Sequence, residues 1–263
     1  MHRDVSATLT LDAAGPARLA LAIAIADGHD AREELAVTRA GEPLAVRTLA
    51  SPHGGRLHLL DVDAGEVRIE YRASVDGFAP APAVEPIDEW RYLRPSRYCE
   101  SDTLRPIALA EFAGLAGAEL LDAVSSWVGV RVAYVPGSSE PTDGAVTTLL
   151  SRSGVCRDFA HLVVAFLRAL DVPARVAAVY APGLDPMDFH AVAEALVDGA
   201  WRVVDATALA PRESLLRIAT GRDAADTAFL TSRGADVDLV GIEVSAVADV
   251  LPSDDAGRLA VLR

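Results

Sequence analysis

Two different spacings of apolar residues divide the chain. In the first part, apolar and polar residues alternate with a period of two, as in strands that bury one face. One such face carries Val67, Ile69, Tyr71 and Ala73, and an earlier one carries Val5, Ala7, Leu9 and Leu11. Turn sequences such as Asp27-Gly28 and Asp76-Gly77 separate these segments. We therefore predict an N-terminal β-sandwich domain over residues 1–80.

A Pro-rich stretch over residues 79–86 then interrupts the pattern, and we predict a linker over residues 81–100. After it the apolar spacing becomes helical, first from Ile107 to Trp127 and then, more regularly, from Cys156 to Leu170. Strands are expected to follow over residues 175–180, 190–197 and 201–205. The predicted fold class is α+β, with residues 101–263 forming one catalytic domain.

Composition narrows the classes of function. The chain has 263 residues, 51% of them hydrophobic, which suits one large domain or two modest ones. Its formal net charge of −14 argues against a nucleic-acid partner, because phosphate binding needs clustered basic side chains. All 24 basic residues are arginine, so the protein offers no lysine amine for cross-linking to itself.

The location of the protein is predicted from what the sequence lacks. Met1 to Leu11 has no basic region followed by an apolar one, as a secretory signal would. The apolar run from Leu19 to Ala26 is far shorter than the roughly 20 residues of a membrane-spanning helix. We expect a soluble, cytoplasmic protein with no membrane partner. Two cysteines make no disulfide framework in that reducing compartment.

Cys156 is a candidate nucleophile because of where it stands. The sequence Ser151-Arg152-Ser153-Gly154-Val155 forms a turn that feeds the predicted helix, so that Cys156 falls in its first turn. The unpaired N–H groups and the positive dipole end of a helix favour a thiolate there. The same N–H groups could hold an oxyanion. The alternative is a buried structural cysteine.

A hairpin brings His190 and Asp205 together. Asp198-Gly199 between two apolar segments is a strong signal for a two-residue turn. If these are the two loop residues, Val192 pairs with Asp205, and His190 becomes a diagonal neighbour of Asp205 on the same face. An imidazole–carboxylate hydrogen bond is then within reach. Such a carboxylate orients the histidine and stabilises the imidazolium that forms when it takes the thiol proton.

Three sequence blocks resemble the motifs of bacterial transglutaminase-like proteins. They are Gly154-Val155-Cys156-Arg157-Asp158-Phe159, Asp188-Phe189-His190-Ala191 and Trp201-Arg202-Val203-Val204-Asp205-Ala206-Thr207. The resemblance covers residues 90–230 well, and the β-rich start in general character. It implies a papain-like core and acyl transfer through a thioester on Cys156, with His190 and Asp205 completing a triad. The superfamily also includes peptidases, deamidases, cross-linking enzymes and members that have lost activity.

The chain departs from the family pattern at two points. Many members carry an aromatic residue shortly after the catalytic histidine, where this chain has Val192 and Ala193. That change widens the acyl pocket or weakens packing on His190. The usual Asp-Pro-Thr is here Asp205-Ala206-Thr207, which retains the carboxylate.

Other polar and aromatic residues are secondary candidates. Tyr98, Trp90 and Trp201 are candidate oxyanion donors or substrate walls, with Trp201 more suited to shielding the His190–Asp205 pair. We expect structural roles for two further groups: Cys99, His161 and Asp158 in packing or capping, and His29, His53 and His58 at turns or on the surface. Residues 219–226 are expected to form a polar surface loop with no assigned chemistry.

The function that these residues favour is cysteine-dependent acyl transfer on a peptide or protein amide substrate, with hydrolysis favoured over cross-linking. The alternative is a catalytically silent transglutaminase-like fold that binds a protein partner. A metal site built on Cys156, a histidine and Asp205 is a third reading, but neither a CxxC pair nor HExxH occurs. We expect no cofactor, no metal and no calcium requirement, and the sequence leaves a homo-oligomer open.

Overall fold

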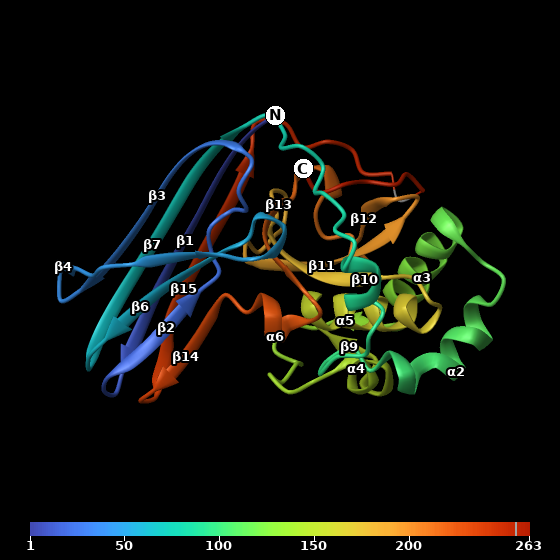
Figure 1. Cartoon of the computed structure of the whole chain (residues 1–263), viewed down its shortest axis with the longest axis horizontal. Coiled ribbons are helices and arrows are strands. Elements are labelled where there is room, and N and C mark those ends of the chain that lie inside the picture. Colours follow the sequence, from blue (N-terminus) through green and yellow to red (C-terminus); the bar gives the residue numbers. More distant parts are fainter. Residues whose placement is uncertain (256) are drawn as a thin grey trace.

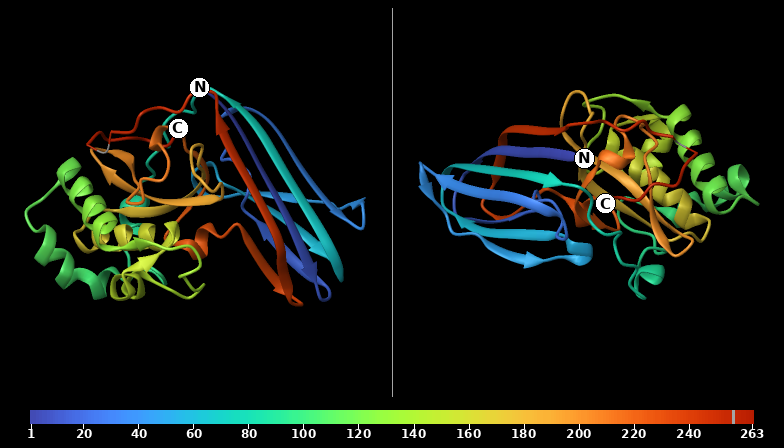
Figure 2. Two further views of the ribbon diagram at one scale, coloured as in Figure 1. Left: turned by 180° about the vertical axis from the view of Figure 1, so that it is seen from behind. Right: turned by 90° about the horizontal axis from the view of Figure 1, so that it is seen from above.

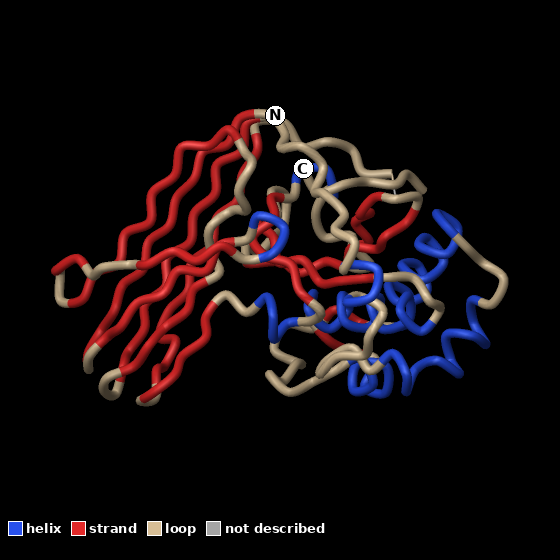
Figure 3. Tube along the Cα trace, in the orientation of Figure 1, coloured by secondary structure: helices blue, strands red, loops and turns tan. Residues whose placement is uncertain are grey.

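The fold has a β-strand part and a mixed helical part that lie side by side (Figure 1). A computed structural model of the chain describes residues 1–255 and 257–263. Strands fill one side of the molecule, and the helices gather on the other side around a smaller sheet (Figure 3). The predicted α+β class, with N-terminal antiparallel sheets followed by a helical core on an antiparallel sheet, is confirmed.

The β-part is built from two antiparallel sheets. Their strand orders are β15-β1-β7-β3-β4 and β14-β2-β6-β5. The strands are β1 (His2–Ala13), β2 (Ala17–Leu21), β3 (Asp30–Arg39), β4 (Glu42–Pro43), β5 (Arg47–Ala50), β6 (Arg56–Val62), β7 (Gly65–Asp76), β14 (Leu230–Gly234) and β15 (Val237–Ala248). A short 3-10 turn, Pro52–Gly54, joins β5 to β6.

The alternation seen in the sequence is the alternation of burial in these strands. Val67, Ile69, Tyr71 and Ala73 of β7 are all buried, whereas the intervening residues face outwards. Strand β1 pairs with β7 in a register that places Leu9 opposite Ile69, so that both strands bury the same face. The two sheets thereby share one apolar core.

The C-terminal end of the predicted catalytic domain differs from the predicted division. Residues 101–263 were assigned to one domain, but β14 pairs with β2 and β15 pairs with β1 (Figure 2). The helical core with its own sheet is therefore inserted between β7 and β14 of the β-part. Pairing between strands so distant in sequence depends on tertiary packing, which local periodicity does not report.

The remaining elements form this inserted core. Its sheet has the order β12-β11-β10-β13, and a two-stranded parallel ribbon joins β8 and β9. The helices are α1 (Asp88–Arg91), α2 (Ser101–Phe112), α3 (Gly117–Arg131), α4 (Ala145–Ser151), α5 (Cys156–Ala169) and α6 (Ala224–Thr227), with a 3-10 turn at Arg212–Ser214. The strands are β8 (Ala133–Tyr134), β9 (Ser153–Gly154), β10 (Ala174–Tyr180), β11 (Phe189–Val197), β12 (Ala200–Val204) and β13 (Leu216–Gly221).

Helix α5 is the central element of this core. Its apolar stripe packs between the sheet and helices α2, α3 and α4, and Phe159, Leu162, Phe166 and Leu167 are buried. Each such side chain contributes about 1.5–3 kcal/mol on burial. The helix ends where Asp171 adopts a positive φ just before Pro173. The N-terminus of α5, which carries Cys156, is fixed by the burial of the rest of the helix.

The two parts of the molecule share a buried interface. The Tyr180 hydroxyl of β10 donates to the backbone oxygen of Ile23 at 2.8 Å, and the Ala26 N–H donates to that of Arg217 at 2.7 Å. Glu194 of β11 is ion-paired with Arg175 of β10 at 2.8 Å and with Arg217 of β13 at 2.5 Å. All three of these charged side chains are buried.

Three histidines of the β-part were predicted to lie at turns or on the surface. His29 and His53 stand at turns, but His58 is buried in β6, so the prediction was wrong for His58. The His53 side chain is almost fully buried and lies 3.3 Å from the buried Asp88 of α1. His58 is also buried, and burial lowers the pKa of His29 to about 4. His53 stands at a turn, and docking of the inserted core covers that turn.

Candidate active site

Cys156 is the first residue of α5 and is partly exposed. The two preceding residues are extended, because Gly154 belongs to β9 and Val155 has φ −113° and ψ −178°. The side chain of Asp158 reaches back one turn, and its Oδ2 accepts the Val155 N–H at 2.8 Å. This is the carboxylate half of a capping box, and it fixes the direction in which the chain enters the helix.

A close contact between Gly154 and Asp158 holds the entry to α5. A Cβ atom on Gly154 would lie 2.7 Å from the Cβ of Asp158 and 2.8 Å from its Oδ2. Asp158 itself is buried. Only glycine fits at position 154 while Asp158 keeps its place, so the glycine before the cysteine is required by packing.

The predicted hairpin has the predicted register. Strand β11 pairs with β12 through Val197–Ala200 and Ala193–Val204, with Asp198 and Gly199 as loop residues at positive φ. His190 Nε2 lies 2.9 Å from Asp205 Oδ2, and both side chains are buried. The turn chemistry of two residues thus sets the contact between a histidine and a carboxylate 15 residues apart.

Asp205 is held from its other side by the loop that follows it. Its Oδ1 accepts the Thr207 N–H at 2.9 Å and the Thr207 hydroxyl at 2.6 Å. The same loop packs tightly on α3, where a Cβ atom on Gly129 would lie 2.7 Å from the backbone oxygen of Ala206. One carboxylate oxygen of Asp205 therefore accepts hydrogen bonds from Thr207, and the other lies against His190.

Opposing effects set the charge of His190. Burial would lower the pKa of this imidazole, but the charge of Asp205, the hydrogen bond to it and the neighbouring Cys156 raise the pKa to about 10. His190 Nδ1 is buried and has no other hydrogen-bond partner within the described part of the chain. A histidine bonded to Asp205 through Nε2 and interacting with Cys156 is arranged as a thiol–imidazole–carboxylate triad.

Tyr134 is a neighbour of Cys156 that the sequence did not indicate. It lies on β8, opposite Gly154 of β9. Burial, together with the charges of Cys156, Asp188 and Asp205, raises the pKa of the Tyr134 hydroxyl to about 12. A hydrogen bond from the Cys156 backbone opposes this rise in pKa. Its hydroxyl therefore lies at the N-terminus of α5, where an oxyanion would form.

Two of the predicted secondary residues lie away from Cys156. Trp201 is buried under the guanidinium of Arg175, 3.9 Å from the ring centroid. It stands four residues before Asp205, about 13 Å along an extended strand. Trp90 of α1 is 64% exposed and neighbours the start of β10, the end of that strand far from His190. The buried Trp201 has a structural contact with Arg175, and a role of Trp90 toward a substrate stays a prediction.

The third secondary residue, Tyr98, packs against α5. Its ring stacks on His161 with centroids 5.4 Å apart, and its N–H donates to Asp223 Oδ2 at 3.0 Å. His161 is a packed histidine, as predicted: it is buried, and its Nε2 accepts the Ala224 N–H at 3.1 Å. A role of Tyr98 toward a substrate stays a prediction.

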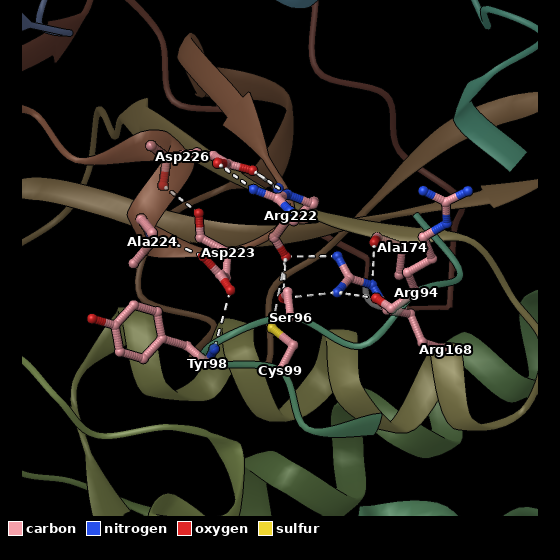
Figure 4. A network of polar contacts seen from close by, with 12 residues as sticks. Arg94, Ser96, Tyr98, Cys99, Arg168, Ala174, Arg222, Asp223, Ala224 and Asp226 are labelled. Carbon is pink, nitrogen blue, oxygen red and sulfur yellow. Dashed lines mark hydrogen bonds and ion pairs between the residues drawn. The ribbon is translucent and has the colours of Figure 1, made fainter. Parts of the chain in front are cut away.

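Residues 219–226 are not the surface loop that the sequence suggested. They include the end of β13 and most of α6, and Asp223 caps α6 through the Ala225 N–H. Figure 4 shows this segment beside Arg168 of α5, which donates to the backbone oxygens of Arg222, Arg94 and Ala174. A buried arginine thus joins the linker, the sheet and the residues between β13 and α6 through carbonyl oxygens.

Cys99 lies in the same network (Figure 4). Its Sγ is 3.8 Å from the Arg222 backbone oxygen, and complete burial raises the pKa of this thiol to about 12. It is a structural cysteine that contrasts with the partly exposed Cys156.

Two other kinds of feature are absent from the described residues. They contain no group of three or more His, Cys, Asp or Glu side chains arranged to hold a metal ion. Across residues 1–255 and 257–263, no helix is both long and apolar enough to span a membrane.

Comparisons with known proteins agree with this geometry. Residues 112–206 match the family described as the transglutaminase-like superfamily. The chain is 31% identical to a candidate cysteine protease from Cytophaga hutchinsonii of known crystal structure, over 97% of this chain and 94% of that one, with a TM-score of 0.88. It is also 30% identical over 139 residues to an uncharacterized protein of Mycobacterium leprae, a match that spans half of that protein's length. This chain, with its helix-borne Cys156 beside the His190–Asp205 hairpin, belongs to the transglutaminase-like superfamily.

Proposed function

We propose that this protein is a cysteine-dependent acyl-transfer enzyme that acts on peptide or protein amides through a thioester on Cys156. The observation that carries the proposal is the placement of His190 between Asp205, at 2.9 Å, and Cys156. Homology to a candidate cysteine protease supports it.

The chemistry follows from the protonation state of the pair. Because the pKa of His190 is raised to about 10, the imidazole is protonated near neutral pH, with Asp205 as its counter-charge. The proton on His190 is the one that the Cys156 thiol has given up, so the resting pair is a thiolate beside an imidazolium. The helix N-terminus favours this anion, and the imidazolium beside it is a ready general acid.

Acylation then proceeds in balanced steps. The thiolate attacks the amide carbonyl, a C–S bond forms, and the carbonyl oxygen becomes an oxyanion near the first N–H groups of α5 and the Tyr134 hydroxyl. His190 gives its proton to the leaving nitrogen, the C–N bond breaks, and an amine departs. Thr207 holds Asp205 so that the imidazole keeps its orientation throughout.

Deacylation reverses the proton flow. Neutral His190 takes a proton from water as the water oxygen attacks the thioester, the C–S bond breaks, and a carboxylic acid is released. An amine in place of water would give a new amide. We favour hydrolysis, because no described residue forms an evident site for a second, amine substrate.

The decisive test compares the two cysteines of one protein. Iodoacetamide labelling of Cys156 and Cys99 is followed by peptide mass spectrometry from pH 5 to pH 9, in wild type and in His190→Ala. We expect rapid labelling of Cys156 already at pH 6, at least tenfold slower in the variant, and little labelling of buried Cys99. Active wild type should then release amines from a library of peptide amides.

A different result would support the alternative function. If Cys156 is labelled only as an ordinary thiol, with a free-cysteine pKa of about 8.5, and His190→Ala changes nothing, the triad is not functional. The fold would then serve as a protein-binding module, and the search would turn to partners.

A further inference from the structure

Asp188 lies next to the proposed catalytic groups but has no part in the triad. It directly precedes β11, two residues before His190, and alternate residues of an extended chain project to the same side. The residue is exposed, whereas His190 is buried. The charge of Asp188 acts on the Tyr134 hydroxyl, whose pKa it helps to raise, and the charge of His190 acts on Asp188.

The cations near Cys156 are already engaged by other groups. The Arg157 guanidinium donates to the Ser139 hydroxyl at 2.5 Å and to the Glu140 backbone oxygen at 2.8 Å, and lies 3.4 Å from Asp158. The charge of His190 is balanced by Asp205.

After Arg157, the arginine closest to Cys156 in the sequence is Arg152, which lies on a different surface. Arg152 lines a surface groove with Ile107, Trp127 and Arg131 on the helical side of the molecule. Within residues 1–255 and 257–263, Asp188 therefore has no cationic side chain in ion-pair contact.

Only part of the Asp188 carboxylate is used by the fold. Its Oδ1 accepts the Phe189 N–H at 2.7 Å, a local contact that an asparagine oxygen can also make. The other oxygen makes no hydrogen bond within the described residues. Partial burial raises the pKa of Asp188, the charge of His190 opposes that rise, and a cation bound beside it would oppose it further.

We propose that Asp188 makes the site beside Cys156 selective for amide substrates that carry a positive charge close to the scissile carbonyl. This inference rests on the proposed function, since it names the substrate class of the same site. A cationic substrate group beside Asp188 would form the ion pair that the carboxylate lacks within the described residues. An anionic substrate group would instead be repelled by Asp188 and by the chain as a whole, whose net charge is −14. The charged substrate group would be an ammonium or a guanidinium.

The selectivity can be measured without knowing the natural substrate. Cys156 is treated with three methanethiosulfonates, one cationic (aminoethyl), one neutral (methyl) and one anionic (sulfonatoethyl). In each case the thiolate forms a mixed disulfide and methanesulfinate leaves. Rates are taken at about 0.01 M ionic strength, where the Debye length is about 30 Å, and normalised to the same reagents on free cysteine. Labelling is read at Cys156 by mass spectrometry.

We expect wild type to favour the cationic over the anionic reagent, and Asp188→Asn to lower that ratio by about tenfold, the effect of one charge at close range. The neutral reagent should react equally with both proteins. Asp12→Asn, on the outer face of the β-part, removes the same net charge far from Cys156 and should leave the ratio unchanged. Equal ratios in wild type and Asp188→Asn would overturn the proposal, as would an equal fall in Asp12→Asn.

A second measurement separates this inference from the proposed function. Ammonia release is compared for N-acetyl-arginine amide, N-acetyl-methionine amide and N-acetyl-glutamate amide, with Asp188→Asn expected to reduce turnover of the arginine compound alone. If no amide is turned over but the reagent ratio still depends on Asp188, the catalytic proposal fails and the charge selectivity stands. If all three amides are turned over equally by both proteins, catalysis stands and the selectivity fails.

Discussion

Replacing Gly154 by alanine should damage both the stability of the protein and the reactivity of Cys156. The added Cβ would lie 2.7 Å from the Asp158 Cβ, and this contact cannot relax through a flexible side-chain end. Either the backbone before Cys156 or the buried Asp158 must move. A shift of Asp158 breaks its 2.8 Å hydrogen bond to the Val155 N–H.

The size of the effect follows from these two losses. Overpacking in a closely packed region costs about 1–3 kcal/mol, and loss of a hydrogen bond to a charged group costs about 1.5–3 kcal/mol. These two energetic costs do not simply add, because movement of Asp158 breaks the hydrogen bond but relieves the steric clash. We therefore expect Gly154→Ala to lower the free energy of unfolding by about 2–4 kcal/mol.

Urea unfolding, monitored by tryptophan fluorescence, gives the stability, and iodoacetamide labelling at pH 6 gives the reactivity of Cys156. Gly241→Ala is the matched control, because the nearest atom to its added Cβ is 3.8 Å away. In the Asp158→Gly background, which removes both the Asp158 Cβ and its carboxylate, Gly154→Ala should cost less than 1 kcal/mol, about the size of an exposed Gly substitution. The reasoning is refuted if Gly154→Ala costs the same in both backgrounds, or no more than Gly241→Ala.

Three further outcomes are expected. Tyr134→Phe removes a hydroxyl beside the Cys156 N–H and should slow acylation of Cys156 by tenfold or more, since loss of one oxyanion donor costs up to about 10²–10³ in rate. Labelling of Cys156 by iodoacetamide should not change. Equal acylation rates in wild type and Tyr134→Phe would exclude that role. Glu194→Ala leaves Arg175 and Arg217 buried without a carboxylate and should cost about 3–5 kcal/mol in urea unfolding, a loss that Arg175→Met with Arg217→Met should reduce. The pKa of His190 rises to about 10 on folding. Protonated His190 therefore stabilises the folded protein fully below the unfolded pKa of about 6.5, and this stabilisation is lost as the pH rises through 10. The difference in unfolding free energy between wild type and His190→Ala should shrink from pH 6 to pH 10, and a difference that grows would contradict this sign.

The site could be predicted where local rules decide the geometry. Asp198-Gly199 sets the turn, the turn sets the register, and the register brings His190 to Asp205. Likewise, the apolar stripe after Cys156 predicts a helix that begins at the cysteine. Each step needs only a few neighbouring residues.

Other parts of the site depend on contacts between distant segments. Tyr134 stands in a two-residue strand, too short for any periodic pattern, and it reaches Cys156 only because β8 pairs with β9. Trp201 was expected beside Asp205 from its strand face, but its ring lies against Arg175. His53 looked like a surface turn residue until the second half of the molecule covered it. Long-range packing decides all three.

The pairing of β15 with β1 has a consequence for synthesis of the chain. The partner of β1 is β15, which ends at Ala248, so a ribosome must make more than 200 further residues after β1 before that edge can be covered. Until then β1, with its apolar face toward an incomplete sandwich, has an open backbone edge on that side, the kind of edge that promotes aggregation. Helix α5 and the His190–Asp205 hairpin involve shorter contacts and can form earlier. The nascent protein thus faces its greatest risk of misassembly in the part that carries no catalytic group.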